Sequence, residues 1–173
     1  IALNGSFFKF KSGVNTEDYN SVDYIRKGNN QLAPNTWPSI GRAMHQLGAL
    51  AIFRGELFIL KADMLREWER YIKADEVLTT GPILRVSGED LLLSKDSFYT
   101  TRHPRTAVGK RADGTILLLT ADGRSPEAAG VSLKELQVIM KWLGAEYAIN
   151  LDGGGSTTLY VEGASDNGVV NHP

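Results

Sequence analysis

Residues 115–152, TILLLTADGRSPEAAGVSLKELQVIMKWLGAEYAINLD, have the most informative pattern of apolar and turn residues in the chain. The run 115–121 is almost continuously apolar, which is typical of a strand buried on both faces. Ser132 and Glu135 then have the spacing of a capping box, a helical apolar stripe follows, and Gly144 stands where that helix should end. A second apolar strand closes the segment. This order predicts a βαβ unit, which takes about 30 residues or more.

The two strands of this unit should run parallel, joined by a right-handed crossover, and end at the same edge of the sheet. Asp122 and Arg124 follow the first strand, and Asp152 follows the second. We therefore expect them on neighbouring strands or one strand apart. Ligands bind at the carboxyl ends of such strands, so this edge is the predicted site.

A run of three glycines follows the second strand within residues 148–161, AINLDGGGSTTLYV. Three glycines bring no side chain to pack and lose much backbone entropy. Their N–H groups can form an anion-binding concavity. The alternative is a wide turn in which Asn150 and Asp152 only satisfy local backbone donors.

A second cluster of polar residues lies on a segment stiffened by proline. Arg102, His103 and Arg105 flank Pro104, which favours an extended backbone before it. Two arginines and a histidine can converge on one anion, because the planar guanidinium suits phosphate oxygens. An edge strand protected by charge and proline explains the same pattern equally well.

The rest of the chain predicts an α+β fold, with a mixed β-sheet core and few helices. Residues 11–40 read as a long surface loop in which Tyr24 and Trp37 hold the loop in place. The remaining predictions are a bent strand over 1–10, a β-hairpin over 47–60, a short helix over 63–76 capped by Asp63, a strand over 81–86 and its continuation at 91–93. We expect one domain over 1–173, as a segment of a longer protein.

Composition narrows the function. The chain has 173 residues, a net charge of −1 and no cysteine. This length fits one domain. The small net charge disfavours nucleic-acid binding, and the absence of cysteine excludes disulfides and thiolate sites. No apolar run suggests membrane insertion within this segment, and no P-loop, serine-hydrolase elbow or zinc-protease motif occurs. We expect no cofactor and no metal, although Asp122 with loop carbonyls is a conceivable cation ligand. The oligomeric state is open.

Two carboxylates beside an anion-binding turn are suited to cleaving a glycosidic bond next to a negative group. The chain also resembles the phosphodiester glycosidase family in several motifs, which occur in the family's order and are densest after residue 100. They are LNGSFF at 3–8, GPIL at 81–84, RHPRTAVG at 102–109, DGR at 122–124, SLKEL at 132–136 and NLDGGGSTT at 150–158. Residues 9–75 resemble the family only weakly.

The resemblance implies hydrolysis of a sugar-1-phosphodiester, such as α-N-acetylglucosamine-1-phosphodiester, and an extracytoplasmic location. Asp152 and Asp122 would be nucleophile or base, in an order that the sequence does not give. The substrate-binding residues would be Asn4, Arg102, His103, Arg105, Thr106, Arg124, Asn150, Gly153, Gly154, Gly155 and Ser156. Two other classes stay open: a glycan- or phosphoglycan-binding module without turnover, and a structural cell-envelope domain.

Overall fold

The computed structural model describes residues 1–9, 20–34, 47–62, 67–164 and 167–172. They fall into two compact units, and each is described by itself. The first combines Ile1–Gly5 with Ile83–Pro173, and the second is Ser6–Pro82. The expectation of a single domain stays a prediction.

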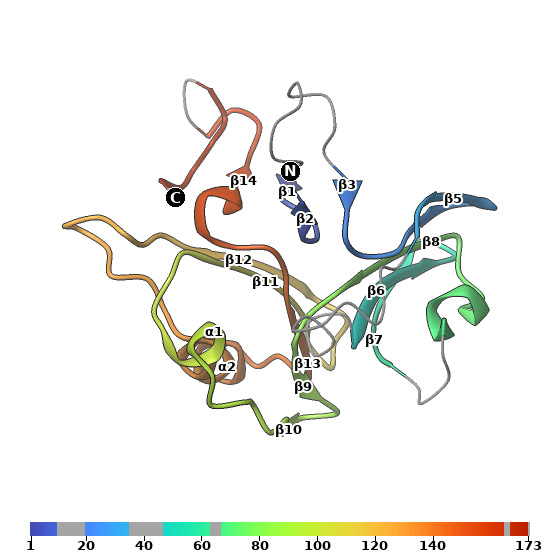
Figure 1. The fold of residues 1–173 in the computed structure, drawn as a ribbon, viewed down its shortest axis with the longest axis horizontal. Helices are drawn as coiled ribbons and strands as arrows, with labels where there is room; N and C mark the ends of the chain where they lie inside the picture. The colour runs from blue at the N-terminus through green and yellow to red at the C-terminus, as the bar shows by residue number, and fades with distance from the viewer. Residues whose placement is uncertain (10–19, 35–46, 63–66, 165–166, 173) are drawn as a thin grey trace. The chain divides into compact units, whose positions relative to one another are not determined.

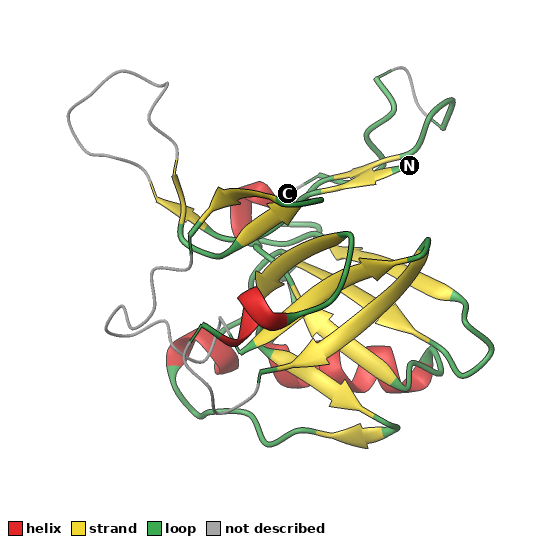
Figure 2. Ribbon diagram, turned by 90° about the vertical axis from the view of Figure 1, so that its right-hand side faces the viewer, coloured by secondary structure: helices red, strands yellow, loops and turns green. Residues whose placement is uncertain are grey.

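The first unit is built on a five-stranded sheet in the order β10-β9-β13-β11-β12 (Figure 1). Its strands are β9 (Ile83–Val86), β10 (Glu89–Asp90), β11 (Arg105–Lys110), β12 (Ile116–Ala121) and β13 (Tyr147–Asn150). Every neighbouring pair is antiparallel. Helices α1 (Ser97–Thr100) and α2 (Leu133–Trp142) cover one face of this sheet (Figures 1 and 2).

The α+β class is confirmed, but the βαβ unit is not. Strand β11 lies between β12 and β13 and pairs antiparallel with both, so the strands on either side of α2 are not hydrogen-bonded neighbours. Because both are antiparallel to β11, they run in the same direction and end at the same edge, one strand apart. The sequence pattern could not show that an earlier strand would insert between them.

The strand β12 is buried on one face only, contrary to the prediction. It lies at the edge of the sheet, and Ile116 and Leu118 are 39% and 40% exposed. Leu117 and Leu119, on the opposite face, pack against the core below the helices. A run of leucines hides the two-residue alternation of a strand, because both faces receive the same side chain.

Helix α2 forms as the sequence predicts. Ser132 Oγ accepts from the backbone N–H of Glu135, and the Glu135 carboxylate accepts from the backbone N–H of Ser132. Leu133, Leu136 and Met140 are completely buried on its inner face. The helix ends at Trp142, and Gly144 takes the positive φ expected of a residue that ends a helix.

After β13 the chain makes the glycine turn, which contains a short 3₁₀ helix, η3 (Gly154–Ser156). It continues into β14 (Leu159–Tyr160), which pairs antiparallel with β1 (Ala2–Leu3). A strand after the glycines is thus confirmed. Its partner is the beginning of the chain, which sequence reasoning did not identify.

The second unit contains a five-stranded sheet in the order β5-β4-β8-β6-β7. Its strands are β4 (Ile25–Lys27), β5 (Asn30–Ala33), β6 (Gly48–Phe53), β7 (Glu56–Lys61) and β8 (Glu76–Thr80); β2 (Phe8–Lys9) pairs with β3 (Asn20–Ser21), and η2 is Trp68–Tyr71. The predicted hairpin over 47–60 is confirmed by β6 and β7.

Three predictions in the weakly patterned parts were wrong. The described residues 20–33 form three strands rather than a loop, and Tyr24 packs in the core of the second unit. Of the expected helix over 63–76, residues 63–66 lie outside the described part, and the described residues form only the 3₁₀ turn η2 before β8 begins at Glu76. Residues 91–93 do not extend the sheet, because β10 ends at Asp90. Trp37 and Asp63 lie outside the described residues.

Within the described parts of the chain, no helix has the length and apolar character needed to cross a membrane.

Candidate active site

The turns that follow β12 and β13 meet at the segment that leads into β11. Gly154 N–H donates to the carbonyl of Pro104 at 2.9 Å. On the other side, a Cβ placed on Gly123 would lie 2.8 Å from the nitrogen of Pro104. Backbone this close to backbone leaves no room for a side chain. A Cβ on Gly153 would likewise lie 2.6 Å from the carbonyl oxygen of Pro104. Gly123 and Gly153 therefore let both turns approach Pro104 and bring three segments into one site.

Asp152 lies half-buried where β13 ends. Its backbone N–H donates to the carbonyl of Gly5 (3.1 Å), and its Oδ1 accepts from the N–H of Gly153 (2.9 Å). Its carbonyl accepts from Asn4 Nδ2 (2.9 Å). Asp152 is thus held by two segments: the glycine turn that follows it, and the residues Asn4 and Gly5 that follow β1.

Asn4 and Thr106 hold the site together from within. Asn4 Oδ1 accepts from Thr106 Oγ1 (2.7 Å) and from the N–H of Thr158 (3.0 Å). Thr106 is fully buried in β11. Both ends of the Asn4 amide are engaged by protein groups, which favours a role in positioning Asp152. The substrate contacts expected for Asn4 and Thr106 stay predictions.

Asp122 is half-buried directly after β12, at the same edge as Asp152. Its Oδ1 accepts from Asn171 Nδ2 at 3.0 Å. Asn171 is a buried residue near the end of the chain that sequence reasoning missed. A single asparagine after an apolar pair gives no signal of its own, and only the return of the chain toward β14 brings it here.

Arg124 lies over the glycine turn. Its backbone has φ 59°, in the left-handed region. Its guanidinium nitrogens Nε and Nη2 lie 3.4 and 3.3 Å from His103 Nδ1. A Cβ built on Gly154 would be 3.0 Å from Arg124 Nη1. An exposed guanidinium beside a turn without side chains can be reached by a ligand anion.

The backbone of His103 is hydrogen-bonded to Val131, and its imidazole ring lies near Arg105 and Arg124. Its N–H and carbonyl pair with Val131 at 3.2 and 3.0 Å. Partial burial, and then the charges of Arg105 and Arg124, lower the pKa of the imidazole below its usual value of 6.5. At neutral pH the ring is therefore uncharged, so Nδ1 can accept a hydrogen bond from Arg124.

Arg105 is almost entirely buried, with 2% of its surface exposed. Its Nε donates to the carbonyl of Val131 (3.2 Å), and its Nη2 donates to those of Phe98 (2.6 Å) and Thr101 (3.1 Å). The guanidinium also lies 4.9 Å from the centre of the Phe98 ring. Burial, and then Arg124, lower its pKa to about 10. These contacts give Arg105 a structural role that its spacing did not predict.

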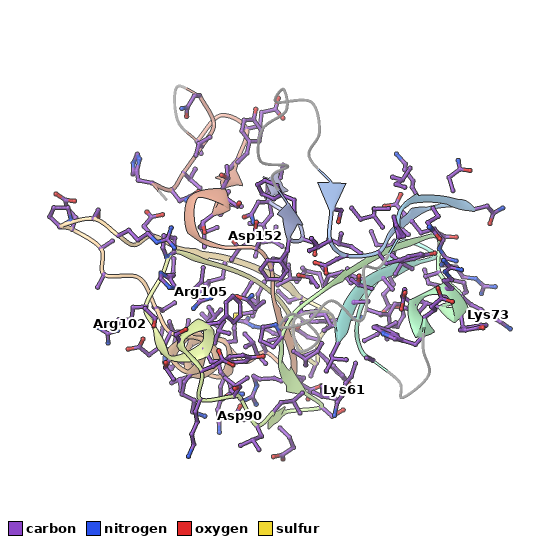
Figure 3. All side chains as sticks on the ribbon, in the orientation of Figure 1. Lys61, Lys73, Asp90, Arg102, Arg105 and Asp152 are labelled. Atoms are coloured by element: carbon purple, nitrogen blue, oxygen red, sulfur yellow. The ribbon has the colours of Figure 1, made fainter. Side chains whose placement is uncertain are left out.

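Arg102 and Arg105 leave the same segment for different surroundings (Figure 3). The Arg102 side chain is mostly exposed and pairs with Glu135 at the start of α2, where Nε lies 3.0 Å from both carboxylate oxygens. This pairing raises the pKa of Arg102 and, with the backbone of Ser132, lowers that of Glu135 to about 2. The predicted phosphate ligand is thus bound to a helix-capping carboxylate.

The glycine turn uses most of its amides internally. The N–H of Gly153 is bound to Asp152 and that of Gly154 to Pro104, while Ser156 N–H donates to the carbonyl of Gly153 (3.2 Å). Gly155 is exposed, and a Cβ there would meet nothing within 4 Å. Among the described residues its N–H has no acceptor, so it is the amide left to a ligand.

Asn150 lies deeper than the other predicted site residues. It is fully buried at the end of β13, and its Nδ2 donates to the carbonyl of Leu151 (2.6 Å). A ligand contact for it stays a prediction.

Comparison with known proteins agrees with the motifs at this site. The model of the phosphodiester glycosidase family matches residues 1–173. The chain belongs to this family.

Three relatives of this phosphodiester glycosidase-family chain give the range of similarity. The SPbeta prophage-derived uncharacterized protein YomE of Bacillus subtilis is 40% identical over 68 residues, 39% of the chain and 11% of YomE. The mouse N-acetylglucosamine-1-phosphodiester alpha-N-acetylglucosaminidase is 35% identical over 92 residues, 53% of the chain and 15% of the mouse protein. The human enzyme is 37% identical over 70 residues, 40% of the chain and 13% of the human protein. The chain thus spans a small part of each.

A solved structure shares the fold. The zebrafish N-acetylglucosamine-1-phosphodiester alpha-N-acetylglucosaminidase catalytic domain, described as auto-inhibited by its pro-peptide, aligns with a TM-score of 0.70. The alignment covers 99% of the chain and 55% of the zebrafish chain, at 20% identity. At this identity the likeness concerns the fold alone.

No group of three or more histidines, aspartates and glutamates suited to a metal ion occurs among the described residues of this family member.

Proposed function

We propose that the chain hydrolyses the glycosidic bond of a sugar-1-phosphodiester, such as α-N-acetylglucosamine-1-phosphodiester. One observation carries the proposal. Two half-buried carboxylates, Asp122 and Asp152, follow strands that end at one edge of a sheet, and the exposed guanidinium of Arg124 lies over the turn beside them. Carboxylates for the sugar and a cation for the phosphate are the groups that this reaction needs.

The phosphate is assigned to Arg124 and the open side of the glycine turn. A guanidinium can donate two parallel hydrogen bonds to phosphate oxygens. The uncharged His103 ring holds that guanidinium without adding a second charge. The N–H of Gly155 adds a donor on the same turn.

The sugar is assigned to the carboxylates. In glycoside cleavage one carboxylate acts as nucleophile or activates water, against an oxocarbenium-like transition state. A phosphodiester is already a good leaving group, so protonating it matters less than stabilising the charge that develops on it. The two aspartates are both candidates for nucleophile or base, and substitution of each in turn assigns the roles.

The named activity of the mouse and human relatives agrees with this proposal. The chain covers only 15% and 13% of these proteins, so their substrate is a proposal here. The extracytoplasmic location that the family suggests also stays a proposal.

The experiment compares two ligands that differ only in the phosphate. The chain is incubated with a sugar-1-phosphodiester and with a neutral glycoside of the same sugar, and release of the free sugar is measured. We expect turnover of the phosphodiester and far slower turnover of the glycoside. Equal rates would remove the phosphate from recognition. Saturable binding of the phosphodiester without turnover would favour the binding-module alternative.

A further inference from the structure

We propose that Asn171 is a positioning residue for Asp122 and holds this carboxylate in the orientation that the reaction requires. The inference rests on the proposed function and extends it to a residue in the last turn of the described chain. It assigns Asn171 no contact with the substrate.

The Asn171 amide is completely engaged. The residue is 5% exposed. Its Nδ2 donates to Asp122 Oδ1 at 3.0 Å and to the carbonyl of Thr157 at 2.8 Å, and its Oδ1 accepts from the N–H of Leu159 at 2.7 Å. Two donors and one acceptor have normal hydrogen-bond lengths. Among side chains of the size of asparagine, only an amide can donate two hydrogen bonds and accept one in this way.

These contacts join both halves of the candidate site. Asp122 belongs to the turn after β12, whereas Thr157 directly follows the 3₁₀ helix of the glycine turn, beyond Asp152. Leu159 belongs to β14, which pairs with β1 and so lies next to the segment that holds Asp152. The Asn171 side chain therefore fixes the position of Asp122 relative to the glycine turn that follows Asp152.

The backbone delivers Asn171 to this position by folding back along β14. Val161 N–H donates to the carbonyl of Gly168 (2.7 Å), Tyr160 pairs with Val169, and Val170 N–H donates to the carbonyl of Leu159 (2.9 Å). These backbone contacts do not involve the Asn171 side chain. Replacing that side chain should leave the fold-back in place.

The chemistry of the contact suits a reacting carboxylate. Among the described residues, Asn171 is the one side chain that donates to Asp122. A neutral donor on Oδ1 fixes the plane of the carboxylate and leaves Oδ2 for a ligand. An arginine or lysine in its place would orient the group but also weaken it as a base or nucleophile, because a positive charge stabilises the carboxylate anion.

The first test separates positioning from general stability. Asn171→Ala should lower kcat by about a hundredfold, the order expected when a reacting group is misplaced by about 1 Å. KM should change much less, because the phosphate contacts remain. The matched control is Met140→Ala, which creates a cavity in the core near Gly109, at the other end of β11. It should lose stability yet keep its kcat per folded molecule.

The second test removes only the donor. Asn171→Asp keeps the size of the side chain and the acceptor for the Leu159 N–H, but it replaces Nδ2 by a carboxylate oxygen that can donate to neither Asp122 nor Thr157. At neutral pH we expect its kcat to fall at least as far as that of Asn171→Ala. An Asn171→Asp protein with the parent kcat would overturn the inference.

Failure of the inference can be told from failure of the proposed function. A parent chain that turns over no sugar-1-phosphodiester overturns the proposed function and the inference with it. An active parent whose kcat survives Asn171→Ala overturns the inference alone, and Asn171 then only fastens the end of the chain.

Discussion

Among single residues, Gly154 and Gly155 of the glycine turn should respond differently to substitution by alanine. Gly154 has φ +60°, and a Cβ there would lie 3.0 Å from Arg124 Nη1, whereas Gly155 has open space around it. We expect Gly154→Ala to cost about 1–2 kcal/mol of stability, the penalty of a left-handed non-glycine residue. It should also displace the guanidinium and reduce phosphodiester turnover per folded molecule.

The matched substitution Gly155→Ala serves as the stability control, and its free energy of unfolding should stay near that of the parent. Urea unfolding and turnover are measured on the same samples. If Gly154→Ala is unstable but fully active per folded molecule, the glycines serve the turn and not the ligand.

The two arginines of this edge should respond differently to lysine. Arg105 donates to three backbone carbonyls, and lysine cannot reach all of them with one ammonium group. Arg105→Lys should therefore lower the free energy of unfolding by about 2 kcal/mol. Arg124→Lys should leave stability within about 0.5 kcal/mol, as is usual at the surface, and weaken phosphodiester binding. Chemical denaturation and ligand titration would show it. The reverse pattern would make Arg105 the phosphate ligand.

His103 gives the chain a predicted pH dependence. Its pKa is lower in the folded protein than the usual 6.5, so the unfolded chain takes up the proton first as pH falls. The free energy of unfolding should therefore be highest above about pH 6.5 and decrease as pH falls toward the lower folded value. His103→Asn keeps an acceptor near Nδ1 but does not titrate. Unfolding measured from pH 7 to 5 should have a smaller slope in this variant, and identical slopes would contradict the assignment.

At the scale of elements, the start of α2 provides the clearest test of a contact that the sequence predicted. Ser132→Ala removes the acceptor for the Glu135 N–H and should cost about 1 kcal/mol. Glu135→Gln keeps a side chain that can complete the capping box but loses the ion pair with Arg102. This exposed pair should contribute less than the cap, because solvent screens it. Thermal unfolding of both variants checks the order, and a larger loss in Glu135→Gln would show that the ion pair matters more than the cap.

The elements that the sequence predicted well are those whose signals are local. The hairpin β6–β7, the capped helix α2 and the strand leading into the glycines each follow from turn residues or periodicity within a few positions. Residues 20–33 lack such a pattern, and their strands form because neighbouring strands supply the pairing. Partners that are distant in the chain, such as β1 for β14, leave no trace in local sequence.

At the scale of the whole molecule, the edge where the candidate residues gather was predictable, but their individual contacts were not. The direction of β12 and β13 follows from the helix between them, so Asp122 and Asp152 meet at one edge even though β11 intervenes. Which of these side chains contact other protein groups depends on how deeply each is buried, and the sequence does not show this. Arg105 resembles a phosphate ligand in the sequence yet lies inside among carbonyls, and Asn171 attracts no notice in the sequence yet contacts Asp122.

The proposed function makes this edge a hydrolytic site for a sugar-1-phosphodiester, and Asp152→Asn removes the carboxylate that such a site needs. The substitution keeps the size of the side chain and an oxygen for the Gly153 N–H, so the circular dichroism spectrum and unfolding midpoint should stay close to those of the parent. The rate of sugar release from the phosphodiester should fall to a small fraction of the parent rate. A folded Asp152→Asn protein that hydrolyses the phosphodiester at the parent rate would contradict a catalytic site at this edge.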